Sequence, residues 1–258
     1  MWKESWWLTK RELKMQIPGI IITLLVTILI GILVVPTINA FVLNIFGDSA
    51  SYANRIIFDN HTFNIDSIII DIIFLGLTPS FSTLFMWGPY LSFRTIKEDP
   101  FGKRLAVYRS LPISTNVLTA SRILVMLSIF VLLSAAFYLT IILSVPAAFF
   151  DYFSFNYFLS FMLFWIGYAL ALGSVITYIE SGTNGKVLFI FLFIITLCLI
   201  IVLLLVYQIW EVGVVEATIL LISKSPIIPV IASIICSILG VITMTKLLKK
   251  RLLERDYL

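Results

Sequence analysis

Charged residues are scarce in this sequence. They make up 12% of its 258 residues, whereas hydrophobic residues make up 60%, and a soluble globular domain has about 25% charged residues. A chain this apolar needs lipid as its solvent, so a soluble globular fold is excluded. The net charge of +4 does not indicate nucleic acid as a partner, because the cations stand beside apolar runs, as they do at a membrane surface.

Histidine and cysteine are nearly absent as well. His61 is the only histidine, and the two cysteines, Cys198 and Cys236, lie in apolar runs without CxxC spacing. These residues offer no metal-ligand cluster, no disulfide framework and no Ser/His/Asp arrangement. The sequence therefore predicts no metal site and no catalytic residues, and we do not expect the chain to be an enzyme.

A phosphate loop is also missing. The run Ser181-Gly-Thr-Asn-Gly-Lys186 has two residues between its glycines, and Val187 follows its lysine. A P-loop has four residues between its glycines, and Ser or Thr follows the lysine of the P-loop. The apolar runs also lack an ionised residue near their midpoints, which proton- and sodium-coupled transporters usually have. Asp71 stands just inside the second run, where a helix N-terminus would favour its charge. We therefore expect neither an ATPase site nor ion coupling in this chain.

Long apolar runs are what the sequence has in abundance. We predict a single transmembrane domain over residues 1–258 with six spans of about 20 residues or more. The spans fall within 17–41, 72–93, 123–150, 152–179, 187–210 and 225–245. Sixteen of the eighteen Lys and Arg residues stand on one side of these runs, which places both termini in the cytoplasm. The predicted fold class is an all-α integral membrane protein.

Four segments outside the spans complete this prediction. Residues 1–17 form an amphipathic elbow helix in the membrane interface, because Trp2, Trp6, Leu13 and Ile17 share an arc of about 60° that lysines flank; the alternative is a simple charged leader. Residues 246–258 continue the last span as a basic cytoplasmic tail. The roles of the outer segments 42–67 and 211–224 stay open. The second of these holds a short apolar run that fits either a surface helix or a re-entrant dip.

The segment 94–122 is a charged island between two apolar runs. It holds six of the eighteen Lys and Arg residues. Asp99 followed by Pro100 is a helix-start pattern, with an acidic N-cap and then proline at the first helical position. Pro112 stops the helix, because proline lacks an N–H and disfavours helical geometry just before it. The pattern predicts a helix over 99–111, parallel to the membrane.

One face of this helix is apolar and its rim is cationic. Phe101, Leu105 and Tyr108 share an arc of about 60° at the helical period. Ser114 can then cap the helix that becomes the third span. The rim consists of Lys97, Lys103, Arg104 and Arg109. The pattern alone leaves a second interpretation open, because an amphipathic loop helix that simply rests on lipid looks the same.

In layout the chain resembles the membrane subunits (permeases) of type-2 ATP-binding-cassette (ABC) exporters. The shared layout is a basic elbow, six spans with both ends inside, and a large first cytoplasmic loop between spans two and three. Its most specific part is the run Leu-Ala-Val-Tyr-Arg-Ser-Leu-Pro-Ile-Ser-Thr-Asn-Val-Leu-Thr-Ala-Ser-Arg-Ile-Leu over 105–124. Small bacterial peptide-exporter permeases, of the kind that export phenol-soluble modulins, have a similar run after their coupling helix.

The resemblance implies partners and contact residues. The helix 99–111 would be a coupling helix that inserts into a groove on a separate cytoplasmic ATPase subunit, which would bind ATP and Mg²⁺ while this chain holds no cofactor. The residues implied for this contact are Glu98, Asp99, Phe101, Lys103, Arg104, Leu105, Tyr108 and Arg109. The elbow around Trp6 and Trp7 would add a second contact or a hinge in the membrane. A second permease, identical or similar, would complete the pathway in a bacterial cytoplasmic membrane.

The cargo is the least specified part of this expectation. The apolar, aromatic-rich spans lack a charged cavity, which favours a hydrophobic or amphipathic substrate. The resemblance implies export of amphipathic cytolytic or antimicrobial peptides. Lipids, lipid-linked polymers and drugs stay open as alternatives, and so does a membrane protein that transports nothing, such as an immunity or assembly factor.

Overall fold

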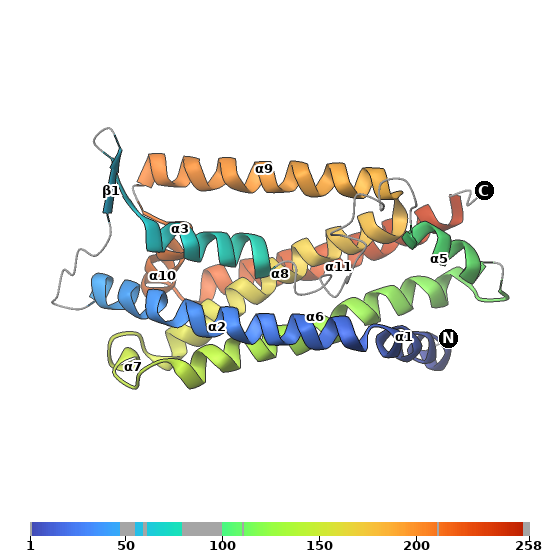
Figure 1. Ribbon diagram of the computed structural model, residues 1–258, viewed down its shortest axis with the longest axis horizontal. Helices are drawn as coiled ribbons and strands as arrows, with labels where there is room; N and C mark the ends of the chain where they lie inside the picture. Colours follow the sequence, from blue (N-terminus) through green and yellow to red (C-terminus); the bar gives the residue numbers. More distant parts are fainter. Residues whose placement is uncertain are drawn as a thin grey trace.

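The computed structural model describes residues 2–46, 55–58, 61–78, 100–109, 111–210 and 212–254. Within these ranges the chain is predominantly helical, as the apolar runs predict, and the long helices extend along one common direction (Figure 1). The first helix begins at the same end of the molecule at which the last helix finishes (Figure 1). The architecture is therefore an elongated helical bundle.

The described elements follow one another along the chain in this order. The helices are α1 (Trp2–Met15), α2 (Ile17–Phe46), α3 (Ile65–Ile72), the π-helix η1 (Ile73–Leu77), α5 (Pro100–Arg109), α6 (Thr115–Ser144), α7 (Phe149–Tyr152), α8 (Phe155–Gly182), α9 (Gly185–Trp210), α10 (Val214–Lys224) and α11 (Ile227–Glu254). The strands are β1 (Arg55–Phe58) and β2 (His61–Asn64), which pair antiparallel.

Five of these helices are long and apolar enough to cross a membrane. They are Ile17–Leu43, Thr115–Ser144, Phe155–Gly182, Gly185–Ile209 and Ile227–Glu254. These five match five of the six predicted spans. Their length and composition make this a membrane-embedded protein.

The remaining predicted span, 72–93, is described only as far as Thr78. Its beginning belongs to a shorter apolar helix, Ser67–Leu77, and the rest lies outside the described residues. The count of six spans therefore stays a prediction.

The hairpin of β1 and β2 is a feature that the all-helical prediction did not contain. Its register pairs Arg55 with Asn64 and Phe58 with His61. The strand sequences Arg-Ile-Ile-Phe and His-Thr-Phe-Asn are rich in β-branched and aromatic residues, which favour a strand over a helix in so short a segment. The hairpin lies in the segment 42–67, whose role the sequence left open.

The helices α8 and α11 approach each other closely at Gly167. A Cβ atom built on Gly167 would lie 2.2 Å from Oγ of Ser233 and 2.9 Å from its carbonyl oxygen. The same Ser233 hydroxyl donates a hydrogen bond to the carbonyl oxygen of Phe164 at 2.6 Å. Small residues at membrane helix crossings let the backbones approach in this way. The glycine is therefore required by the α8–α11 contact.

Aromatic rings fill the centre of the bundle. Phe74 of η1 lies among Phe137 of α6 and Phe161 and Trp165 of α8, with ring centroids 5.0–5.8 Å from its own. All four side chains are buried. Such edge-to-face and tilted pairs are favourable beyond the area that they bury, so they hold the start of the second predicted span against α6 and α8.

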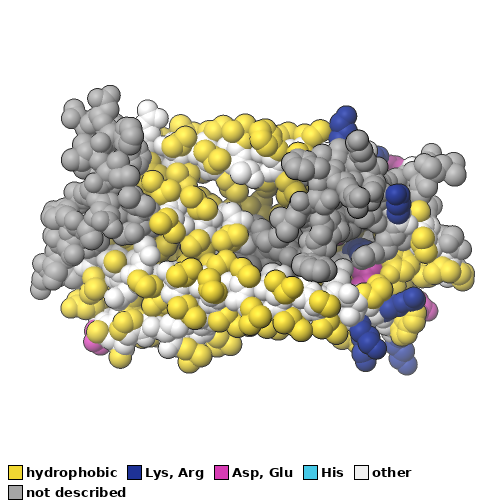
Figure 2. All heavy atoms as spheres, in the orientation of Figure 1, with side chains coloured by type: hydrophobic (Ala, Val, Ile, Leu, Met, Phe, Trp, Pro, Cys, Tyr) yellow, Lys and Arg dark blue, Asp and Glu magenta, His cyan; other side chains and the backbone are white. Residues whose placement is uncertain are grey.

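The outer surface of the bundle is apolar over most of its length. Figure 2 shows hydrophobic side chains along the helices, with Lys and Arg side chains gathered toward the end that holds α1. The helix α9 runs along one side of the bundle (Figure 1), and large exposed side chains follow it from Val187 to Ile209. An exposed apolar surface of this extent fits lipid as the surrounding solvent.

Candidate functional site

The helix α5 is the central element of the candidate site. It begins at Pro100 and ends at Arg109, three residues before Pro112. These bounds agree with the predicted start and stop to within two residues. After Pro112 the chain turns into α6, whose N-cap Ser114 accepts a hydrogen bond from the backbone N–H of Val117 at 3.4 Å. The predicted Ser114 cap is confirmed.

The side chains on one face of α5 are buried by the chain itself. Leu105 is 1% exposed and Tyr108 is 7% exposed, whereas Val107 and Lys103 point outward. Leu105 and Tyr108 belong to a compact group of buried side chains that we call the basal cluster. Its members are Leu8, Leu105, Tyr108, Leu118, Leu248 and Leu252, with Ile113 and Tyr178 packed against them.

The basal cluster joins α5 to its neighbour α6 and to the more distant helices α1, α8 and α11. Leu8 comes from α1, Leu118 from the first turn of α6, and Leu248 and Leu252 from the last turns of α11. Tyr178, near the end of α8, packs at its edge. A displacement of α5 must therefore disturb the ends of α1, α6, α8 and α11, because tightly packed side chains transmit strain.

The structure separates the residues predicted for partner contact into three groups. Glu98 and Asp99 lie outside the described residues, as do the side chains of Phe101, Arg104 and Arg109. Lys103 is exposed on α5. Leu105 and Tyr108 differ from the prediction, because they face the chain's own helices and hold α5 in place. The sequence predicts that the apolar face of α5 contacts the ATPase subunit, but the side chains of Leu105 and Tyr108 on that face are covered by other helices of the same chain.

A buried ion pair connects α1 to α6 beside this cluster. The guanidinium Nη2 of Arg122 donates to Oε1 of Glu12 at 2.7 Å. The Glu12 side chain is fully buried and that of Arg122 is 7% exposed. A buried carboxylate needs such a partner, since an uncompensated charge in a low-dielectric interior is costly. The pair fixes α1 to the N-terminal part of α6.

The same guanidinium group also faces α5. Its carbon Cζ lies 5.9 Å from the centroid of the Tyr108 ring, within the range of a cation–π interaction. Arg122 thus contacts the elbow through Glu12 and α5 through Tyr108. This arrangement could not be predicted from the sequence, because Glu12 and Arg122 are 110 residues apart. The only signal was a single arginine directly before the third predicted span, 123–150, at a position that the structure places two turns into α6.

The helix α1 has one buried face and one exposed face. Its buried residues are Ser5, Leu8, Thr9 and Glu12. The Thr9 hydroxyl donates to the carbonyl oxygen of Ser5 at 2.8 Å and lies 3.3 Å from that of Ser121 on α6. The predicted interfacial residues Trp2, Trp6 and Trp7 are all exposed on the other side, and Leu13 is half-buried. This exposure of large aromatic side chains fits a helix in the headgroup region.

The end of α11 is held at the same end of the molecule. Nε of Arg251 donates to the carbonyl oxygen of Gly182, the last residue of α8, at 3.3 Å. The side chains of Leu248 and Leu252 are fully buried in the basal cluster. The predicted basic tail therefore continues the last helix as far as Glu254 and packs onto its neighbours.

A second polar anchor lies at the opposite end of the bundle. The Asp71 carboxylate accepts hydrogen bonds from the backbone N–H groups of Val214 at 2.8 Å and Val215 at 2.7 Å. It therefore caps the N-terminus of α10, whose partial positive charge favours an anion. A Cβ atom on Gly213 would lie 3.0 Å from both Asp71 Oδ2 and the Tyr207 hydroxyl, which is why glycine suits this position. The predicted position of Asp71, at the N-terminus of the second span, is wrong, because its own helix α3 already begins at Ile65 and the carboxylate caps α10 in its place.

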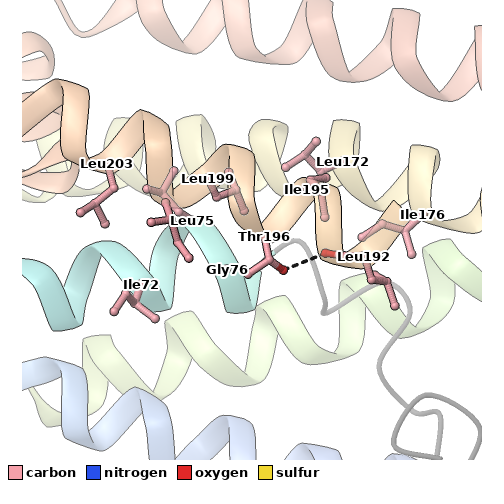
Figure 3. Close-up of a pocket in the computed structure, with 11 residues that line it drawn as sticks. Ile72, Leu75, Gly76, Leu172, Ile176, Leu192, Ile195, Thr196, Leu199 and Leu203 are labelled. Atoms are coloured by element: carbon pink, nitrogen blue, oxygen red, sulfur yellow. Dashed lines mark hydrogen bonds between the residues drawn. The ribbon is translucent and has the colours of Figure 1, made fainter. Parts of the chain in front are cut away.

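An apolar cavity of about 190 Å³ lies between η1, α8 and α9. Figure 3 shows its lining, with Leu75 and Gly76 on one side and residues of α8 and α9 on the others. Thr196 brings a side-chain hydroxyl, which already donates to the carbonyl oxygen of Leu192 at 2.8 Å (Figure 3). A Cβ atom on Gly76 would meet no atom within 4 Å. The cavity can therefore accept an apolar group and offers little to an ion.

The described residues contain no group of three or more His, Cys, Asp or Glu side chains that could hold a metal ion. Comparison with family models, with curated proteins and with solved structures gave no match to this chain. The assignment of a function therefore depends on the sequence pattern and on the geometry of the basal cluster, the buried ion pair and the apolar cavity.

Proposed function

We propose that this chain is the permease subunit of an ATP-driven ABC exporter. It would act as a pair of permease copies with two separate ATPase subunits, in a bacterial cytoplasmic membrane with both termini inside. The observation that carries this proposal is the attachment of α5 to the ends of four other helices through Leu105, Tyr108 and Arg122.

The attachment of α5 suits a helix that transmits force. A coupling helix needs one face bound firmly to the transmembrane helices and another face free for the partner. The buried Leu105 and Tyr108 supply the first face, and the exposed Lys103 lies on the second. Movement imposed on α5 by a closing ATPase dimer would then pass into α6, α8 and α11 together.

The apolar cavity between η1, α8 and α9 supports an apolar or amphipathic cargo. The cavity beside Gly76 is lined almost entirely by aliphatic side chains, and no ionisable residue is among them. Such a lining accepts hydrophobic side chains and rejects ions, since an unpaired charge in an apolar site is strongly disfavoured. We therefore favour amphipathic peptides, cytolytic or antimicrobial, over ions and polar solutes.

The decisive experiment is co-purification with an ATPase. The neighbouring reading frames would first be searched for an ABC ATPase. That ATPase would be expressed with the chain, the complex purified through a tag on the chain, and the product assayed for bound ATPase and for ATP hydrolysis. The test variant is Lys103→Glu, because the lysine is exposed on α5 and its replacement leaves the basal cluster intact. Lys249→Glu is the matched control, since it reverses an exposed charge on α11 at the same end of the molecule.

We expect Lys103→Glu to weaken ATPase association about tenfold, as like charges across an interface do, while Lys249→Glu behaves as the unaltered chain. A permease whose Lys103→Glu and Arg109→Glu variants both keep full ATPase association and export would contradict the assignment of α5. Absence of any adjacent ABC ATPase, or of association with it, would favour the alternative of a membrane protein that transports nothing. A deletion strain with unchanged peptide export and resistance would exclude peptides as cargo and leave lipids, polymers and drugs.

A further inference from the structure

A groove lies where the side of α1 meets α6, away from the basal cluster. It has a volume of about 490 Å³ and is formed where α1 turns into α2 against the side of α6. This size falls within the range of about 300–1,000 Å³ that is usual for small-molecule sites. The residues that line it are Lys10, Leu13, Lys14, Ile17, Ile20, Ser128, Ile129 and Leu132.

The groove has an apolar body and a cationic mouth. Leu13, Ile17 and Ile20 form one wall, and Ile129 and Leu132 of α6 form the other. The two lysines stand four residues apart on α1, so they lie on the same face of the helix, one turn from each other. The apolar and the cationic parts therefore meet along one continuous surface.

The positive charge at the mouth of the groove is not neutralised within the described chain. Lys10 and Lys14 are both exposed, and neither has an ion-pair partner among the residues that the structure describes. The carboxylate nearest to them along α1 is that of Glu12, which points to the opposite face and is bound to Arg122. The mouth therefore presents two unpaired cations to any ligand that enters.

We propose that this groove binds one anionic glycerophospholipid of the surrounding membrane. The phosphate lies between Lys10 and Lys14, and an acyl chain follows the apolar walls toward Ile20 and Leu132. Charge complementarity selects the ligand, because the only charged side chains that line the groove are cations at the level where an interfacial helix meets headgroups. The amphipathic shape selects a lipid over a free anion. This inference does not depend on the exporter assignment.

The expected preference follows from the two lysines. One Lys near an anionic membrane surface favours binding by about fivefold, so two give about 30-fold for an anionic over a zwitterionic lipid. The full chain would be purified in a neutral detergent and titrated with phosphatidylglycerol or with phosphatidylcholine, and bound lipid would be counted by native mass spectrometry. We expect about 30-fold tighter binding of phosphatidylglycerol.

Three variants make the test specific. In Lys10→Gln/Lys14→Gln the preference should fall to near unity. In the matched control Lys246→Gln/Lys249→Gln, which removes two exposed lysines from α11 at the same end of the molecule, it should persist. Ser128→Phe fills the groove without changing any charge, and should weaken binding of both lipids.

Several results would overturn the proposal. Equal losses in the two double variants would mean that general surface charge attracts the lipid. Unchanged binding in Ser128→Phe would remove the groove from the site. Displacement of the lipid by inorganic phosphate alone would identify a simple anion site in its place.

Discussion

The ion pair of Glu12 and Arg122 allows the sharpest test of how the elbow is attached. Replacing Glu12 by leucine leaves the Arg122 guanidinium buried without its counter-charge. Replacing both residues, as Glu12→Leu/Arg122→Met, removes the charges together and keeps apolar side chains of similar length. If the pair is the attachment, the single substitution must be much more destabilising than the double one.

The magnitudes can be worked from the structure. Both side chains are more than nine-tenths buried, and removal of one partner of such a pair costs about 3–5 kcal/mol. Replacement of both partners by apolar side chains is often neutral or stabilising. Here the replacement also removes two buried polar atoms, Glu12 Oε2 and Arg122 Nε, that have no hydrogen-bond partner among the described residues. The double variant loses the contact of Arg122 with the Tyr108 ring, a contact of about 0.5–2 kcal/mol. We therefore expect a net cost near 1 kcal/mol for the double variant.

The assay is urea unfolding of the purified chain in a mild detergent, followed by tryptophan fluorescence. The quantity of interest is the coupling free energy between the two substitutions, which requires both single variants and the double one. We expect a coupling of about 2 kcal/mol or more. A coupling near zero, or a Glu12→Leu variant as stable as the unaltered chain, would show that the pair does not hold α1 to α6.

Two further predictions concern the opposite end and the bundle centre. Asp71→Ala removes the acceptor for the first two N–H groups of α10 and should destabilise that helix by about 1–2 kcal/mol. The loss should be seen as faster amide hydrogen exchange over α10. Asp151→Ala, which removes an exposed carboxylate, is the control, and equal exchange rates over α10 in the two variants would refute the cap. Gly167→Val should separate α8 from α11, because even its Cβ atom would stand 2.2 Å from Ser233 Oγ, and should lower the unfolding temperature strongly. Gly76→Ala, whose Cβ atom meets nothing within 4 Å, should leave that temperature unchanged.

Local signals in the sequence were enough to predict much of this fold. Five apolar runs became five candidate spans, since length and composition decide that property without reference to any distant residue. The Ser114 cap and the limits of α5 were also predicted, because caps and prolines act on the residues next to them. What these features share is that their cause and their effect lie within one turn or one run of the chain.

Contacts between distant segments could not be predicted in the same way. The partner of Glu12 is Arg122 and the partner of Asp71 is the start of α10, and both depend on how helices pack in space. The helical periodicity predicted that Leu105 and Tyr108 lie on one covered face of α5, and both side chains are buried. It could not predict that other helices of the same chain cover that face, because periodicity carries no information about the neighbouring segment. The hairpin β1–β2 was not predicted, because two strands of four residues each are too short to show a clear alternation of apolar and polar residues.

The two faces of α1 connect the proposed function with the proposed lipid site. The inner face holds Glu12 on Arg122, which in turn lies against Tyr108 of α5. The outer face carries Lys10 and Lys14 at the mouth of the groove. Because one rigid helix of 14 residues bears both faces, a lipid that holds the outer face also restrains the position of Arg122. The helix α1 then links the membrane surface to α5, and Arg122 of the buried ion pair is the residue through which that link reaches α5.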